Sequence, residues 1–299
     1  MFFSVVIPTK DRPDDLFFAV ESICNQTIKI SQLIIIDQSK MPQNRSKITK
    51  LISSVKNIKL QYIHDPKVKG LVEAKSRSLR YVTGDIVCFL EDDIILDNNY
   101  FKHIKKGFDD NSKMIGCCGV VTNPPKKNFI YKFFFNAFHQ GIFKDPRFII
   151  QNNLENLIKT YYPSNMISGG ISAWKKEVFD QIKFDIKNSF HLFEDIDFST
   201  RVASYYKNSL FINTNARLEH NCSPINRDFF KQRQKRKVTE SFLYYKKRVS
   251  WRFAKSSFII LLFGMLLEAT FESISSRSFD SLKGYFNGIK LGYKTRVRF

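Results

Sequence analysis

Short apolar runs rich in β-branched residues alternate with helical stretches through the first third of this chain. The runs are Phe3–Ile7, Leu33–Ile36, Leu60–Ile63 and Ile86–Leu90. Between them, apolar residues recur at helical spacing from Asp14 to Cys24, over Lys47–Val55 and over Leu71–Val82. This alternation is typical of βαβ units, in which parallel strands form one sheet and helices cover its faces. The sequence therefore predicts an α/β fold with a Rossmann-like, mostly parallel sheet flanked by helices.

Length and composition favour a packed protein over a disordered one. The chain has 299 residues, of which 43% are hydrophobic and 15% aromatic, enough for one large domain with an appendage. Its five cysteines are odd in number and form no CxxC pair, so we expect reduced, mostly structural thiols. The start, MFFSVVIPT followed by KDRPDD, lacks the apolar stretch of a signal peptide, and we expect a cytoplasmic protein.

An acidic triplet, Glu91-Asp92-Asp93, follows the buried run Ile86–Leu90 directly. Carboxylates this close repel one another unless a cation or hydrogen-bond donors compensate. Mg²⁺ and Mn²⁺ take carboxylate oxygens and also bridge to phosphates, so the triplet suits a metal-held diphosphate. A solvated acidic turn is the alternative. Ligands of such sheets bind beyond the carboxyl ends of the strands, where Asp37 is expected too.

A second acidic cluster, Glu194, Asp195 and Asp197, opens a helix predicted to continue to Tyr206. It follows Gly169-Gly170, which predicts a tight turn, and a helix expected from about Lys175. Favourable charge at a helix N-terminus, worth a few tenths to ~1 kcal/mol, would also explain these carboxylates. Taken alone, the cluster favours that explanation.

Five segments resemble the family 2 inverting glycosyltransferases in order and spacing across residues 3–220. They are SVVIPTKDRPDDL, LIIIDQS, GLVEAKSRSLRYVTGDIVCFLEDD, ISGGISAWKKEVF and FEDIDFSTRV. The resemblance implies a GT-A fold and a metal-dependent hexosyltransferase that uses a nucleoside-diphosphate donor, most commonly a UDP-sugar. The implied acceptor is a hydroxyl of a lipid-linked bacterial surface glycan, such as an O-antigen, lipopolysaccharide or capsule.

The same resemblance implies roles for individual residues. Asp195 is the expected general base, beside Glu194, and Asp93 and His220 are the expected ligands of Mn²⁺ or Mg²⁺. The residues expected to bind the nucleotide sugar are Pro8, Thr9, Arg12, Asp37, Lys75, Glu91, Asp92 and Gly170. The chain departs from the family at Ala74-Lys75-Ser76, where Ala-Arg-Asn is common, and at Lys10-Asp11, where Tyr-Asn is common. These departures leave the contacts to the diphosphate and the base open.

Basic charge is concentrated toward the C-terminus. Residues 221–299 hold 17 Lys and Arg against 5 Asp and Glu, so they contribute +12 of the net charge of +20. We predict a catalytic domain over 1–225 and a basic helical region over 226–299, with an insertion or acceptor-side lobe from about 124 to 163. The apolar run Phe258–Leu267 is shorter than the ~20 residues of a spanning helix. It predicts an interfacial helix on the anionic inner face of the plasma membrane, with a core helix as the alternative.

Other functions explain less of the sequence. A non-catalytic basic protein that binds membranes or nucleic acid accounts for the charge but leaves both acidic clusters unexplained, so nucleic acid is not the expected partner. A Rossmann oxidoreductase needs GxGxxG after the first strand, where this chain has Pro8-Thr9. A degenerate scaffold protein would have little reason to retain Asp93, Asp195 and His220 together.

Overall fold

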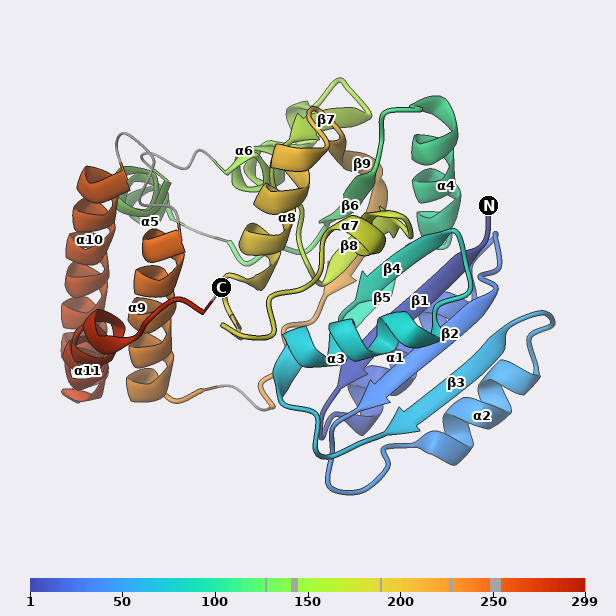
Figure 1. The fold of residues 1–299 in the computed structure, drawn as a ribbon, viewed down its shortest axis with the longest axis horizontal. Coiled ribbons are helices and arrows are strands. Elements are labelled where there is room, and N and C mark those ends of the chain that lie inside the picture. The colour runs from blue at the N-terminus through green and yellow to red at the C-terminus, as the bar shows by residue number, and fades with distance from the viewer. Residues whose placement is uncertain (127, 141–144, 189, 226–227, 248–253, 299) are drawn as a thin grey trace. The chain divides into compact units, whose positions relative to one another are not determined.

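The computed structural model describes residues 1–126, 128–140, 145–188, 190–225, 228–247 and 254–298. They form two compact units (Figure 1). The larger unit comprises Met1–Pro124, Pro146–Ser189 and Glu194–Asn226, and the smaller unit comprises Pro125–Asp145, Phe190–Phe193 and Arg227–Phe299. The smaller unit therefore includes two segments that precede residue 226.

The larger unit is built on one mixed sheet with the order β3-β2-β1-β4-β8-β6-β9-β5, and β7 pairs with β9. The strands are β1 (Phe3–Thr9), β2 (Gln32–Asp37), β3 (Lys59–His64), β4 (Ile86–Leu90), β5 (Ile94–Leu96), β6 (Gly116–Val121), β7 (Tyr161–Ser164), β8 (Ile171–Lys175) and β9 (Leu210–His220). The first four strands in that order are parallel, as the sequence predicts. Beyond β4, only the β6–β9 pair is parallel, and β8 runs antiparallel to both of its neighbours.

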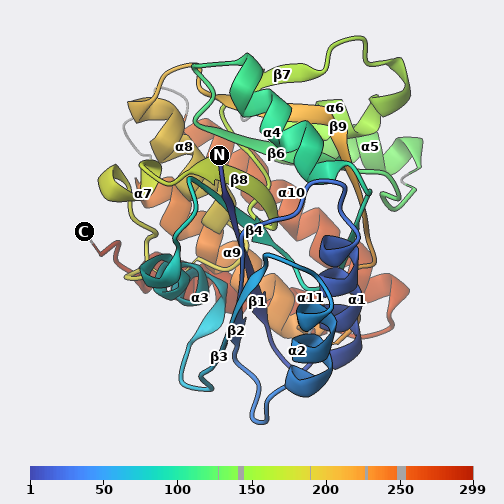
Figure 2. The same cartoon turned by 90° about the vertical axis from the view of Figure 1, so that its right-hand side faces the viewer.

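Helices cover both faces of the parallel strands. Figure 2 shows α3 (Gly70–Ser78) on one side of β1–β3 and α1 (Pro13–Cys24) and α2 (Arg45–Ser53) on the other. Because both faces are covered, β1, β2 and β4 are buried along their whole length, which explains their continuous apolar sequences. Pro13 begins α1 and Asp14 and Asp15 follow in its first turn, a favourable start for a helix.

The second half of the larger unit adds α4 (Tyr100–Asp110), α6 (Pro146–Asn152), α7 (Val178–Gln181) and α8 (Glu194–Tyr205), with a 3-10 turn at Leu154–Asn156. Another 3-10 turn, Leu79–Tyr81, follows α3 in the first half. The prediction of α8 is confirmed. The prediction of a helix from about Lys175 is wrong. Lys175 is the last residue of β8 and pairs with Ile86 of β4, and the helix that follows begins at Val178 and makes only one turn.

The smaller unit is helical. It contains α5 (Phe129–Phe135), a π-helical turn (Asn136–Gln140), α9 (Phe230–Lys247), α10 (Ala254–Ser275) and α11 (Asp280–Lys294). Val238, Met265, Ala269 and Tyr285 are central to its apolar core. The core of the larger unit is separate.

Helix α10 (Ala254–Ser275) extends beyond both ends of the apolar run Phe258–Leu267 that the sequence analysis identified. It passes through Glu268 and continues to Ser275, because Glu268 pairs with Lys237 of α9 and does not end the helix. By length and composition alone, Lys255–Ser275 is long and apolar enough to cross a membrane, and 39% of an 18-residue window in it is buried. The helix is therefore longer than the run Phe258–Leu267, and its length does not exclude a spanning helix.

Candidate active site

The first acidic cluster lies between β4 and β5. β5 pairs antiparallel with β9, and the register sets Ile94 opposite His220. This pairing brings His220 Nε2 to 2.9 Å from Glu91 Oε2 and 3.2 Å from Asp93 Oδ1. Ligand atoms of Glu91, Asp93 and His220 all lie within 4.8 Å of one another. The two predicted metal ligands, Asp93 and His220, are therefore adjacent, and Glu91 joins them.

Electrostatics shows how strongly this cluster attracts positive charge. The close contacts with the carboxylates of Asp93 and Glu91 raise the pKa of His220 to about 10. Burial acts to raise the pKa of Asp93, but the contact with His220 and the hydrogen bond from the N–H of Ser223, 2.8 Å from Asp93 Oδ2, help to lower it to about 2. A protonated imidazole thus balances the two carboxylates, as a divalent cation would. When the imidazole releases its proton, two carboxylates and one imidazole nitrogen form a donor set that fits the predicted Mn²⁺ or Mg²⁺.

Asp92 is buried and bonds to other partners than that trio, although Arg12 Nη1, one of these partners, also lies 3.5 Å from Asp93 Oδ2. Asp92 Oδ2 accepts a hydrogen bond of 2.7 Å from Thr9 Oγ1, and Asp92 Oδ1 accepts one of 2.9 Å from Arg12 Nη1. Arg12 also donates to the carbonyl oxygen of Ile225. Burial raises the pKa of Asp92, and the bonds from Thr9 and Arg12 act in the opposite direction. These three predicted nucleotide-sugar residues therefore bind one another and hold the acidic loop in place.

Two further predicted residues lie at the same edge of the sheet. Pro8 is buried in β1, and Thr9 pairs with Asp37 at the end of β2. The Asp37 carboxylate is itself buried and accepts hydrogen bonds from Ser39 N, Gln43 N and Tyr62 Oη, at 2.9, 2.8 and 2.6 Å. Asp37 therefore organises the loop after β2, and its role toward a nucleotide base stays a prediction.

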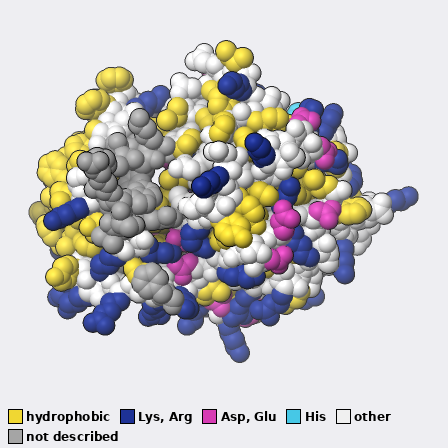
Figure 3. All heavy atoms as spheres, turned by 45° about the horizontal axis from the view of Figure 1, so that its top comes forward, with side chains coloured by type: hydrophobic (Ala, Val, Ile, Leu, Met, Phe, Trp, Pro, Cys, Tyr) yellow, Lys and Arg dark blue, Asp and Glu magenta, His cyan; other side chains and the backbone are white. Residues whose placement is uncertain are grey.

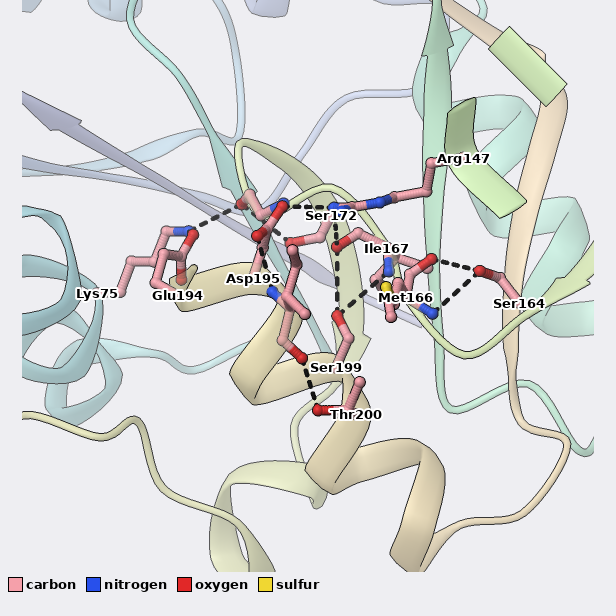
Figure 4. A network of polar contacts seen from close by, with 12 residues as sticks. Lys75, Arg147, Ser164, Met166, Ile167, Ser172, Glu194, Asp195, Ser199 and Thr200 are labelled. Carbon is pink, nitrogen blue, oxygen red and sulfur yellow. Dashed lines mark hydrogen bonds and ion pairs between the residues drawn. The ribbon is translucent and has the colours of Figure 1, made fainter. Parts of the chain in front are cut away.

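The second acidic cluster begins α8, and each of its two leading carboxylates meets a cation (Figure 4). Glu194 Oε1 lies 2.6 Å from Lys75 Nζ, which also donates to the carbonyl oxygen of Gly169 at 3.0 Å. Asp195 Oδ2 lies 2.5 Å from Arg147 Nη1 of α6. The Glu194 side chain is 7% exposed and the Asp195 side chain 21% exposed. Asp195 is thus the more accessible carboxylate.

The turn Gly169-Gly170 separates the two acidic clusters. A Cβ atom on Gly170 would overlap the carboxylate of Glu91, and one on Gly169 would overlap Glu194 Oε1 and lie 2.9 Å from Asp195 Cβ. Because glycine has no Cβ atom, the backbone of this turn can lie directly against side chains of both acidic clusters. Glu91 of the first cluster therefore approaches one glycine of this turn, and Glu194 and Asp195 of the second cluster approach the other.

Arg147 is the functional candidate that sequence reasoning missed. It lies where the sequence pattern is weak, and 48 residues separate it from Asp195. A single arginine there carries no local signal, and only the fold brings it to the acidic cluster.

Comparisons with known proteins show the family and the fold of the chain. Residues 4–183 match the family model described as Glycosyl transferase family 2. No curated protein matches the sequence of the chain. The structure of a mannosyltransferase from Pyrobaculum calidifontis, PcManGT, in complex with GDP-Man and Mn²⁺, is similar at a TM-score of 0.60 and 11% identity, over 98% of this chain and 87% of that one.

Two other solved structures share the fold. S. aureus TarS, residues 1–349, is similar at a TM-score of 0.58 and 11% identity, over 97% of this chain and 81% of that one. GalNAc-T7 with UDP, GalNAc and Mn²⁺ is similar at a TM-score of 0.56 and 13% identity, over 83% of this chain and 50% of that one. Because the sequence identities are this low, the structural similarity shows a common fold alone.

Proposed function

The chain belongs to glycosyl transferase family 2 and has a GT-A-like fold, and from this premise we propose an inverting hexosyl transfer to a lipid-linked glycan. The donor is a nucleoside-diphosphate sugar, with a UDP-sugar as the first candidate. The acceptor is a hydroxyl of a bacterial surface glycan such as an O-antigen, lipopolysaccharide or capsule. The observation that carries the proposal is the meeting of the two acidic clusters at Gly169-Gly170.

The chemistry divides between the two sides of that turn. Glu91, Asp93 and His220 would hold Mn²⁺ or Mg²⁺, which supplies positive charge to a departing diphosphate. On the other side, the acceptor oxygen attacks the anomeric carbon while the bond to the diphosphate breaks. The Asp195 carboxylate accepts the proton that the acceptor hydroxyl loses. Attack on the face opposite the leaving group gives inversion.

The neighbouring cations support the choice of Asp195 as the base. Lys75 neutralises Glu194 in the interior, whereas Asp195 keeps part of its side chain accessible. Arg147 holds Asp195 Oδ2 and fixes the orientation of the carboxylate. Lys75 is thus assigned to the support of the acidic pair, and Arg147 to its orientation.

Calorimetric titration tests the proposal directly. The wild-type protein is titrated with UDP, GDP and CDP, each with and without Mn²⁺, beside the variants Asp93→Ala and Asp195→Asn. We expect one nucleotide to bind only with Mn²⁺, and Asp93→Ala to weaken that binding by at least about 10-fold. Asp195→Asn keeps the binding but, in a separate assay in which water replaces the acceptor, slows hydrolysis of the donor to free sugar and nucleoside diphosphate by about 10²- to 10⁴-fold. If no nucleotide binds while oligonucleotides or anionic vesicles do, the catalytic proposal is wrong.

We also propose that the smaller unit attaches the protein to the inner face of the plasma membrane. The exposed apolar side chains of α10 form one stripe along the helix: Ile259, Ile260, Phe263, Leu267, Phe271 and Ile274. On and beside α11, the exposed aromatics Phe279, Phe286 and Tyr293 recur every seven residues, with exposed Lys283, Lys290 and Lys294 between and after them. Figure 3 shows hydrophobic and basic side chains gathered over the helices of this unit. Interleaved aromatic and basic residues suit an anionic membrane surface.

Ion pairs within the smaller unit favour surface attachment over crossing. Arg233 of α9 pairs with Glu272 of α10, and Lys237 pairs with Glu268. α9 is strongly basic, so it does not suit the hydrocarbon core. α10 would have to leave these pairs to cross a membrane, and its two glutamates would then need other partners.

Sedimentation with vesicles tests the attachment. Phosphatidylcholine vesicles with and without about a third of phosphatidylserine supply the neutral and anionic surfaces. The variant Phe279→Ser/Phe286→Ser/Tyr293→Ser should lose most of its binding to anionic vesicles. The matched control Phe18→Ser/Tyr205→Ser removes exposed aromatics from the larger unit and should bind as the wild type does. Equal binding of both variants would contradict the proposal.

A further inference from the structure

A buried glutamate of α9 holds the segment Phe190–Phe193 by its backbone. Glu240 Oε2 accepts hydrogen bonds from the N–H groups of His191, Leu192 and Phe193, at 3.0, 2.7 and 3.3 Å, and Oε1 accepts a second one from His191 at 3.0 Å. Successive N–H groups that point to one centre form an anion-binding concavity. The Glu240 carboxylate fills it, and the bonds offset the cost of burying its charge.

Two other residues on the same face of α9 hold the side chains of this segment. The Tyr244 ring stacks on the Phe193 ring with 5.6 Å between centroids, and Lys247 Nζ lies 5.1 Å from the centroid of the Phe190 ring. Positions 240, 244 and 247 recur at the spacing that aligns side chains along a helix. We call this arrangement of Glu240, Tyr244 and Lys247 around Phe190–Phe193 the Glu240 clasp.

The residue after Phe193 is Glu194, the first residue of α8, and Asp195 follows it. The three backbone groups held by Glu240 therefore immediately precede the acidic pair. We propose that Glu240 is a positioning residue for the proposed transfer, because it fixes the chain from which the catalytic carboxylate projects. This inference rests on the proposed role of Asp195. It gives the basic C-terminal helices a part in catalysis besides membrane attachment.

The hydrogen bonds that Glu240 accepts determine which variants test the Glu240 clasp. Glu240→Ala removes all four hydrogen bonds, whereas Glu240→Gln keeps one acceptor oxygen and loses the charge. Glu272→Gln is the matched control, because it breaks the ion pair with Arg233 in the same unit and leaves Phe190–Phe193 untouched. If Glu240 held the segment without positioning Asp195, its variants would exchange faster at residues 191–193 but would have the kcat of this control.

Two measurements on the full chain test whether Glu240 holds residues 191–193 and whether it positions Asp195. The first is amide hydrogen exchange of residues 191–193, which should be about 10- to 100-fold faster in Glu240→Ala, intermediate in Glu240→Gln and unchanged in Glu272→Gln. The second is Mn²⁺-dependent hydrolysis of an equimolar mixture of UDP-glucose, UDP-galactose, UDP-N-acetylglucosamine and GDP-mannose, in which water takes the sugar and nucleoside diphosphate is released. We expect Glu240→Ala to lower kcat by about 10-fold or more, with the affinity for UDP or GDP in Mn²⁺ unchanged.

The outcomes separate this inference from the proposed function. Unchanged exchange in Glu240→Ala overturns the clasp, whatever the activity. Faster exchange with a kcat no lower than that of Glu272→Gln overturns the positioning role. A wild-type protein that binds no nucleoside diphosphate contradicts the proposed function and the catalytic part of the inference together, while the exchange experiment still reports whether Glu240 holds the segment.

Discussion

The buried ion pair between Lys75 and Glu194 supports the inner side of the candidate active site. The two side chains are 2% and 7% exposed, and 2.6 Å separates Nζ from Oε1. Loss of one partner leaves a buried charge without compensation, which costs about 3–5 kcal/mol. We expect Lys75→Met to lower the free energy of unfolding by about that amount, and Lys75→Met/Glu194→Gln to recover most of it. Urea denaturation followed by circular dichroism measures both.

A partly exposed pair provides the control for this cycle. Arg77 pairs with Asp65 and Glu73 on the surface of the same helix region, so Arg77→Met should cost less than about 1 kcal/mol. If the double variant were no more stable than Lys75→Met alone, the unpaired Glu194 charge would not be the cause of the loss.

Individual site residues differ in how far sequence alone reveals them. Glu91-Asp92-Asp93 and Glu194-Asp195 stand at the ends of elements with strong local patterns, so their positions follow from the chain itself. The environment of Asp37 does not, because Tyr62, which donates to it, comes from the neighbouring strand β3. Arg147 depends on a contact across 48 residues. Local patterns place carboxylates at a sheet edge, whereas long-range contacts decide which partners they meet.

Among the elements, the parallel half of the sheet was predictable and the antiparallel half was not. β1 to β4 are short apolar runs bounded by turns, and each was identified from its own sequence. β8 lies between β4 and β6 through pairs such as Cys88 with Ala173 and Cys118 with Ser172. These pairs join residues more than fifty positions apart, so periodicity does not encode them.

Close packing of α11 on α9 gives an element-scale prediction. A Cβ atom on Gly288 would lie 2.7 Å from Val238 Cβ and 2.9 Å from the carbonyl oxygen of Lys235. Gly288→Ala should therefore push the helices apart and destabilise the smaller unit by about 1–3 kcal/mol. Asn287→Ala, at the exposed position next to it, should have little effect. Urea denaturation compares the two, and equal stabilities would contradict the packing described here.

The π-helical turn Asn136–Gln140 contains a histidine that makes stability depend on pH. Burial lowers the pKa of His139 from 6.5 to about 4; Lys237 acts in the same direction and Glu268 in the opposite one. As pH falls, His139 therefore takes up its proton at a higher pH in the unfolded chain than in the folded one. The free energy of unfolding decreases for this reason between about pH 6.5 and pH 4. Over that interval, we expect the free energy of unfolding of the wild type to fall by up to about 3 kcal/mol more than that of His139→Gln. Urea denaturation across it measures the difference, and parallel losses in the two proteins would contradict this assignment.

At the scale of the whole molecule, negative and positive charge are concentrated on different elements. Negative charge is focused at the candidate active site, where Glu91, Glu194 and Asp195 lie against one turn and Asp93 lies beside Glu91. Positive charge is concentrated in the last eighty residues, which contribute +12 of the net +20. Because these charges lie on different elements, surface attachment and metal-dependent nucleotide binding should respond to different substitutions.

The lysines of α11 provide the test of that separation. Each basic residue near an anionic membrane contributes about 1 kcal/mol, so Lys283→Gln/Lys290→Gln/Lys294→Gln should weaken binding to phosphatidylserine-containing vesicles by about 100-fold at low salt. The loss should shrink at about 0.5 M salt, because screening weakens exposed charges. Lys105→Gln/Lys106→Gln/Lys113→Gln, an equal change of charge on the larger unit, should leave vesicle binding nearly intact. The α11 variant should also bind nucleoside diphosphate and Mn²⁺ as the wild type does. If both triple variants weakened vesicle binding equally, net charge alone would govern attachment and the face of α11 would have no specific role.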